Sequence, residues 1–142
     1  MKRFFLLTII LTVVVTGKVG AQEAASASKR ANQQYVLFES ERDKGTNVTA
    51  MYDYLMDSYE NFMKVVEAPD NSQYIGGAKN RLRALYPYLL NGAVYYSEQK
   101  QPSKALDFAA AYIDMPQLKL FRSELLPKDN RYASVGYYAA VA

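Results

Sequence analysis

The chain has no cysteine, no histidine and no tryptophan among its 142 residues. Without cysteine it can form no disulfide, no thiolate metal site and no thiol nucleophile. Without histidine it lacks the base of most catalytic triads and the commonest metal ligand in proteins. These absences exclude every histidine-based triad and every cysteine or histidine metal site.

Glycine and proline are also sparse, at 7 and 5 residues, and several of them mark breaks in the pattern. Lys44-Gly45 combines a basic last turn with a glycine stop, which is a typical helix end. Pro102 suits the first position of a helix, where its missing N–H is no loss. Between the breaks, apolar residues recur at steps of three and four, which predicts an all-α protein.

We expect helices over residues 27–44, 48–67, 78–100 and 102–113, paired as hairpins 27–67 and 78–116. Pro87 inside the third helix predicts a kink or a fresh start near Tyr86. A third hairpin is expected to start at residue 130. The residues expected to face inward are Ala31, Tyr35 and Phe38; Val48, Met51, Tyr52, Leu55, Tyr59, Phe62, Met63 and Val66; Leu82, Leu85, Leu89, Ala93 and Tyr96; and Leu106, Ala109, Ala110 and Ile113.

Residues 1–21 have the features of a secretory signal peptide. Lys2 and Arg3 give a positive start, an apolar run follows, and Val19 and Ala21 have the spacing that signal peptidase accepts. The apolar run is shorter than the roughly 20 residues that span a bilayer, although an uncleaved anchor is the alternative. No cysteine follows for lipid attachment. We therefore expect a periplasmic or secreted protein with no stable membrane span after cleavage, and a small, polar and flexible segment at 22–30.

Net charge gives no sign of a nucleic-acid partner. The full chain carries +3, but Lys2, Arg3 and Lys18 leave with the signal peptide, so 14 basic and 14 acidic residues remain. The basic residues at 79–83 are interpreted as a solvated helix start, because nucleic-acid binding needs a clustered basic face. Gly76-Gly77 is interpreted as a hinge, because the lysine and serine or threonine of a phosphate loop do not follow.

A small stand-alone enzyme that uses carboxylates or tyrosines is the remaining catalytic alternative. Asp53 and Asp57 are four residues apart on one helix, but they lie opposite the apolar stripe, where nothing would separate their pKa values. We therefore predict no enzyme activity, no catalytic residue, no metal site and no cofactor.

The spacing of small and aromatic residues resembles that of tetratricopeptide-repeat proteins. This family places a small residue in one helix, an aromatic three positions later and an alanine nine positions after that, as Ala93, Tyr96 and Ala105 do here. Further copies are Phe38, Gly45, Ala50 and Tyr54, and the run at 136–139. In its tyrosine-rich composition and its signal peptide, the chain resembles exported tetratricopeptide-like proteins of the Bacteroides group.

This resemblance implies a short solenoid of stacked antiparallel hairpins over residues 31–142, whose concave face binds a peptide or a partner protein. The implied function is that of an exported, non-enzymatic interaction scaffold. The groove-facing residues that the resemblance implies are Asn32, Tyr35, Glu39 and Arg42 in the first helix, and Leu90, Asn91, Val94 and Glu98 in the third.

The last residues are apolar, where a repeat protein usually ends in a polar capping element. From this we expect a solenoid truncated at its C-terminal end, with the chain as the front part of a longer protein. The alternative function is thus an N-terminal helper or docking domain of a longer periplasmic enzyme or outer-membrane transport component. Self-association through Tyr132 to Val141 is a further alternative.

Overall fold

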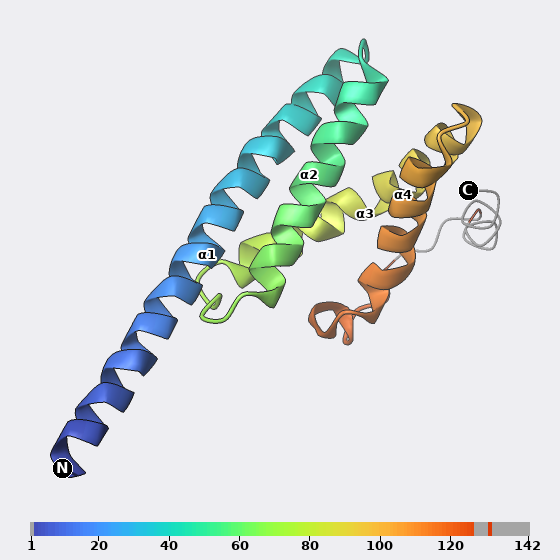
Figure 1. Cartoon of the computed structure of the whole chain (residues 1–142). Helices are drawn as coiled ribbons and strands as arrows, with labels where there is room; N and C mark the ends of the chain where they lie inside the picture. The colour runs from blue at the N-terminus through green and yellow to red at the C-terminus, as the bar shows by residue number, and fades with distance from the viewer. Residues whose placement is uncertain (1, 127–130, 132–142) are drawn as a thin grey trace. The chain divides into compact units, whose positions relative to one another are not determined.

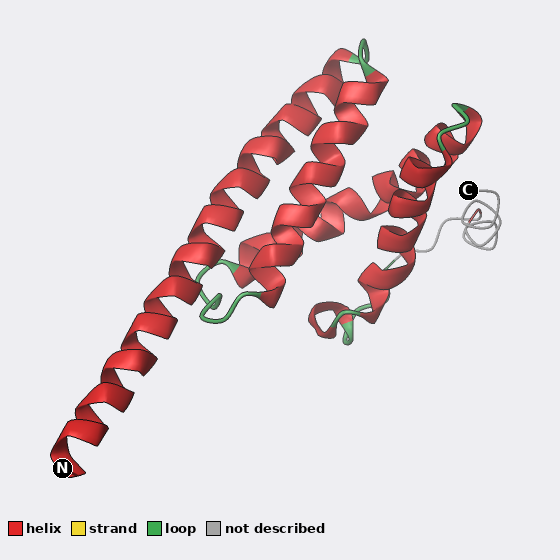
Figure 2. Ribbon diagram, in the orientation of Figure 1, coloured by secondary structure: helices red, strands yellow, loops and turns green. Residues whose placement is uncertain are grey.

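The computed structural model describes residues 2–126 and residue 131, and the described part is all-helical (Figures 1 and 2). Four α-helices follow one another, and their bounds are α1 Lys2–Lys44, α2 Val48–Glu67, α3 Ile75–Glu98 and α4 Pro102–Asp114. Two short 3₁₀ turns, Met115–Gln117 and Lys119–Phe121, come after α4. The predicted all-α class is confirmed, whereas the third hairpin expected from residue 130 falls almost wholly outside the described residues.

The chain divides into two compact units, Met1–Asn80 and Arg81–Ala142, and each is described by itself. The first unit is dominated by the hairpin of α1 and α2, which lie side by side in Figure 1. Gly45 adopts a left-handed φ of 64° in the connection. The side chain of Asn47 then caps α2, because its oxygen accepts a hydrogen bond from the N–H of Ala50 at 3.0 Å. The predicted bounds of α2 and the predicted end of α1 are confirmed.

Helix α1 begins far earlier than the expected residue 27, and residues 22–30 are helical instead of flexible. Ala24 and Ala27 in this stretch are buried. The composition is small and polar, which suggested disorder. However, small residues are also what lets two helix backbones approach closely, and packing against another element outweighs weak local preference. The expectation of a flexible segment at 22–30 is therefore corrected.

Helix α1 also touches the connection that follows α2. Gly20 is buried there, and a Cβ at this position would lie 2.6 Å from Cγ of Pro69. Only a glycine allows such an approach without a shift of the neighbouring chain. None of the helices in the described part is both long and apolar enough to cross a membrane.

Helix α3 begins at Ile75, so Gly76 and Gly77 belong to its first turn and do not form a hinge. The helix runs through Pro87, whose exposed position keeps the ring out of the core. It ends in a Schellman motif, in which the N–H of Gln101 donates to the carbonyl of Tyr96 at 2.9 Å and Lys100 takes the left-handed position. The expected stripe of Leu82, Leu85, Leu89, Ala93 and Tyr96 is buried as predicted.

Aromatic contacts hold α4 against the second half of α3. The rings of Tyr86 and Tyr112 stack with centroids 4.4 Å apart, and Phe108 lies 5.5 Å from the ring of Tyr96. Phe108 also covers Gly92, where a Cβ would come within 2.3 Å of its Cδ1. The absence of a side chain at Gly92 is thus what makes room for the Phe108 ring.

These contacts set the rotation of α4, and they differ from the prediction. Leu106 and Ile113 were expected to face inward, but they are 44% and 38% exposed, and Ala110 is exposed too. The face turned inward carries Phe108 and Tyr112 instead, together with Ala109, whose predicted burial is confirmed. The larger aromatic side chains have more area to bury, so they decide which side of the short helix meets the core.

We expect Gly92→Ala to destabilise the protein by about 1–3 kcal/mol, because the new methyl group overlaps the Phe108 ring in a packed core. Chemical denaturation followed by circular dichroism measures this. Gly77→Ala, in the same helix with open space around it, is the matched control and should raise stability slightly. Adding Phe108→Leu to Gly92→Ala should recover part of the loss. Equal effects of the two alanine substitutions would contradict this account of the α3–α4 contact.

Candidate functional site

The groove residues expected on α1 fall into two groups in the structure. Asn32 is exposed, and its amide donates to the carbonyl of Ser28 at 2.8 Å. Glu39 and Arg42 are half-buried. The Arg42 guanidinium pairs with Asp43 at 2.9 Å and lies 5.7 Å from the centre of the Phe38 ring. These three side chains remain accessible on one side of the helix.

The residues expected on α3 divide in the same way. Glu98 is exposed and Val94 is half-buried. Asn91 is half-buried, and its Oδ1 accepts a hydrogen bond from Arg131 at 2.6 Å. This second set belongs to the unit Arg81–Ala142, so its accessible members are described apart from those on α1.

Tyr35 and Leu90 do not face an open groove, so the groove assignment implied by the resemblance is corrected for both, whereas the expectation from periodicity that Tyr35 faces inward is confirmed. Leu90 is fully buried, and Tyr35 is 5% exposed with its ring edge-on to Phe38 at 5.9 Å. The repeat spacing assigned both residues to the surface of the groove. The buried stripe of each helix is wider than that assignment assumed, so residues at the edge of the stripe are also in the core.

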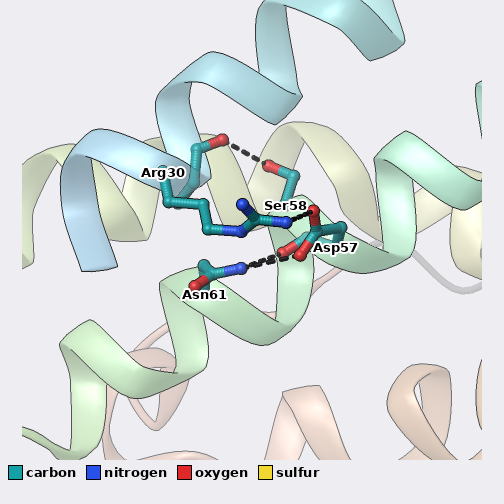
Figure 3. Close-up of polar contacts among 5 residues, drawn as sticks. Arg30, Asp57, Ser58 and Asn61 are labelled. Atoms are coloured by element: carbon teal, nitrogen blue, oxygen red, sulfur yellow. Dashed lines mark hydrogen bonds and ion pairs between the residues drawn. The ribbon is translucent and has the colours of Figure 1, made fainter. Parts of the chain in front are cut away.

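The most connected polar group in the first unit lies between α1 and α2 and is drawn in Figure 3. Arg30 of α1 pairs with Asp57 of α2 at 2.7 Å. The Asn61 amide nitrogen donates to the backbone carbonyl of Asp57 at 2.8 Å and to its carboxylate at 2.9 Å. Asp57 therefore joins the two helices on the outside of their contact.

Ser58 makes the corresponding contact on the inside. It is fully buried, and its hydroxyl donates to the backbone carbonyl of Ala31 at 2.9 Å. The two residues are 27 positions apart in the chain, so this bond ties α1 directly to α2. Because a serine is small, the α2 backbone can come close enough to reach a carbonyl of α1 in this way.

Sequence reasoning missed this cluster, although the sequence carries a signal for it. Ser58 and Asn61 lie between Leu55, Tyr59 and Phe62 on the apolar stripe of α2, where an uninterrupted stripe would carry larger apolar residues. Small or polar residues inside such a stripe point to a close helix contact or a buried hydrogen bond. Asp57 was placed opposite the apolar stripe, but it is half-buried and is held by Arg30 and Asn61.

The chemistry of the cluster favours positioning over reaction. The Ser58 hydroxyl donates its proton to a backbone carbonyl, and no described base contacts it. In the part of the chain that the structure describes, no three acidic residues gather closely enough to hold a metal ion. What the arrangement does is fix the register of α1 on α2, and so present a defined surface on either side of the hairpin.

Comparison with known proteins adds no family to this description. No family model, no curated protein and no solved structure matches the chain.

We expect Ser58→Ala to lower the free energy of unfolding by about 1 kcal/mol, through loss of one buried hydrogen bond. Ser58→Leu should cost more, about 1–3 kcal/mol, because the larger side chain pushes the helices apart. Urea denaturation provides both values, and Ser72→Ala at an exposed turn serves as the neutral control. A Ser58→Leu variant as stable as the parent would show that the close α1–α2 contact is unimportant.

Proposed function

We propose that this chain is an exported, non-enzymatic scaffold that binds a peptide or a partner protein on stacked, tetratricopeptide-like helical hairpins. The observation that carries the proposal is the rigid pairing of α1 and α2. The buried Ser58–Ala31 bond and the Arg30–Asp57 pair fix the register of the two helices. A fixed register presents the side chains along the outer surface of α1 in a constant geometry, which lowers the entropic cost of binding a partner.

Tyr35 and Leu90 are buried, so they are no longer candidates for contact with a partner. The accessible candidates that remain form two separate sets, which are Asn32, Glu39 and Arg42 on α1 in the first unit, and Asn91, Val94 and Glu98 on α3 in the second. Tyr35 supports the surface from beneath through its contact with Phe38. Most of these groups are polar or charged, which suits recognition of an extended peptide through hydrogen bonds and salt bridges.

A second candidate function rests on the exposed side of α4. Leu106, Ala110 and Ile113 are exposed at steps of four and three, so they lie along one side of this helix. Apolar groups gathered on a surface are typical of contacts with another protein or domain. This favours the alternative that the chain docks within a longer periplasmic enzyme or an outer-membrane transport component.

We expect a photo-crosslinking amino acid at Asn32 or Glu98 to form a discrete adduct with one partner in the native host. The reason is that each position is exposed and is one of the proposed contact residues of its own unit. Gel shifts followed by mass spectrometry identify the adduct.

The matched control carries the same crosslinker at Leu37, which is exposed on another side of α1. Adducts that form equally from Leu37 and Asn32 would reject the proposed surface. Adducts that form only from Leu106 or Ile113 would favour docking through α4.

Export is tested separately, by the intact mass of the protein recovered from its native source together with sequencing of its terminal peptides. We expect a mature chain that starts at Gln22, because Val19 and Ala21 have the spacing that signal peptidase accepts. Such a chain keeps Ala24 and Ala27 but loses Gly20 and its contact with Pro69. A product that retains Lys2 would show that residues 1–21 remain as an anchor.

A further inference from the structure

Helix α1 is continuous across the expected cleavage point, which is the peptide bond between Ala21 and Gln22. Both of these residues are exposed, whereas Ala24 is fully buried and Ala27 is 7% exposed. A mature chain that starts at Gln22 therefore has its first residue outside the packed part of the helix. That residue is nevertheless only two positions before one that the fold holds in place.

A glutamine at the first position of a chain has a reaction open to it that an internal glutamine lacks. Its α-amino nitrogen is free and can attack Cδ of its own side-chain amide. The new N–Cδ bond closes a five-membered lactam, and the bond between Cδ and the amide nitrogen breaks. The departing nitrogen takes one proton from the amine and leaves as ammonia. Because both groups belong to one residue, the step is intramolecular and needs no oxidant, reductant or co-reactant.

We propose that Gln22 is a modification site, at which the mature N-terminus cyclises to pyroglutamate. This inference rests on the proposed export, because only cleavage after Ala21 gives Gln22 a free amine. The exposed position of Gln22 leaves its side chain room to fold back onto that amine. An α-amino group is partly neutral at neutral pH, so the attacking form is present under ordinary conditions.

The start of the mature α1 accommodates the ring and gains from the loss of charge. The lactam joins the backbone nitrogen to the side chain as proline does, and a ring of this kind suits the first helical position. Linear Gln22 would place an ammonium at the start of α1, where the partial charge of the helix is also positive. Cyclisation removes this ammonium and leaves Glu23 as the first charged residue, with a sign that is favourable there.

The test is amine labelling of the intact mature protein, recovered from its native source, before any digestion. The label blocks Lys29, so trypsin then releases residues 22–30 by cutting after Arg30. We expect this peptide to carry no label at its N-terminus and to be lighter than the linear sequence by the mass of one ammonia. Labelling comes before digestion because linear glutamine peptides also cyclise during handling.

The other outcomes separate this inference from the export proposal. A peptide that starts at Gln22 with a labelled amine would overturn the cyclisation and leave export and cleavage after Ala21 standing. A terminal peptide that starts at any other residue would overturn the cyclisation together with the cleavage point on which it rests.

Gln22→Asn is the matched control, because it keeps a side-chain amide but would have to close a strained four-membered ring. We expect complete loss of the blocked N-terminus in this variant, seen as full labelling of residue 22. Gln22 is exposed, so far-ultraviolet circular dichroism should show unchanged helicity. A Gln22→Asn chain that starts at residue 22 and stays unlabelled would show a different blocking group and reject the lactam.

Discussion

The close approach of α1 to α2 is the constraint on which the first unit depends. Ala24, Ala27 and Ala31 bring no bulk to the contact, and Ser58 is small enough to reach the Ala31 carbonyl across it. A buried hydroxyl costs free energy unless it is hydrogen-bonded, so this bond favours a single register. With the register fixed, Asp57 meets Arg30, and Asn61 is held against Asp57.

The α3–α4 contact is also a close approach of two helices, but it is made by a large side chain packing over a glycine. Here a glycine on one helix receives an aromatic ring from the other, as Gly92 receives Phe108. The stacked pair of Tyr86 and Tyr112 then fixes the direction of approach, because parallel rings have a narrow range of favourable offsets. The chain lacks tryptophan but has 13 tyrosines. Three of them, Tyr86, Tyr96 and Tyr112, are among the largest fully buried side chains of this hairpin.

The proposed binding function rests on the surfaces that remain exposed after the helices have packed. Helix α1 offers the polar side with Asn32 and Glu39, and α4 offers an apolar side with Leu106 and Ile113. At the start of the mature α1, Gln22 is exposed two positions before the buried Ala24, and it is the proposed site of lactam formation.

The sequence by itself determined the helical class, the bounds of α2 and the buried stripe of α3, because periodicity and local signals such as Asn47 and Pro102 suffice for these. Predictions from the sequence were wrong where the outcome depends on how two helices pack against each other. The helicity of residues 22–30, the rotation of α4 and the burial of Leu90 were decided by tertiary packing. The cluster around Asp57 was decided in the same way, since it joins residues 27 positions apart. Local patterns describe one helix at a time, and only the packed structure shows which side of each helix is covered.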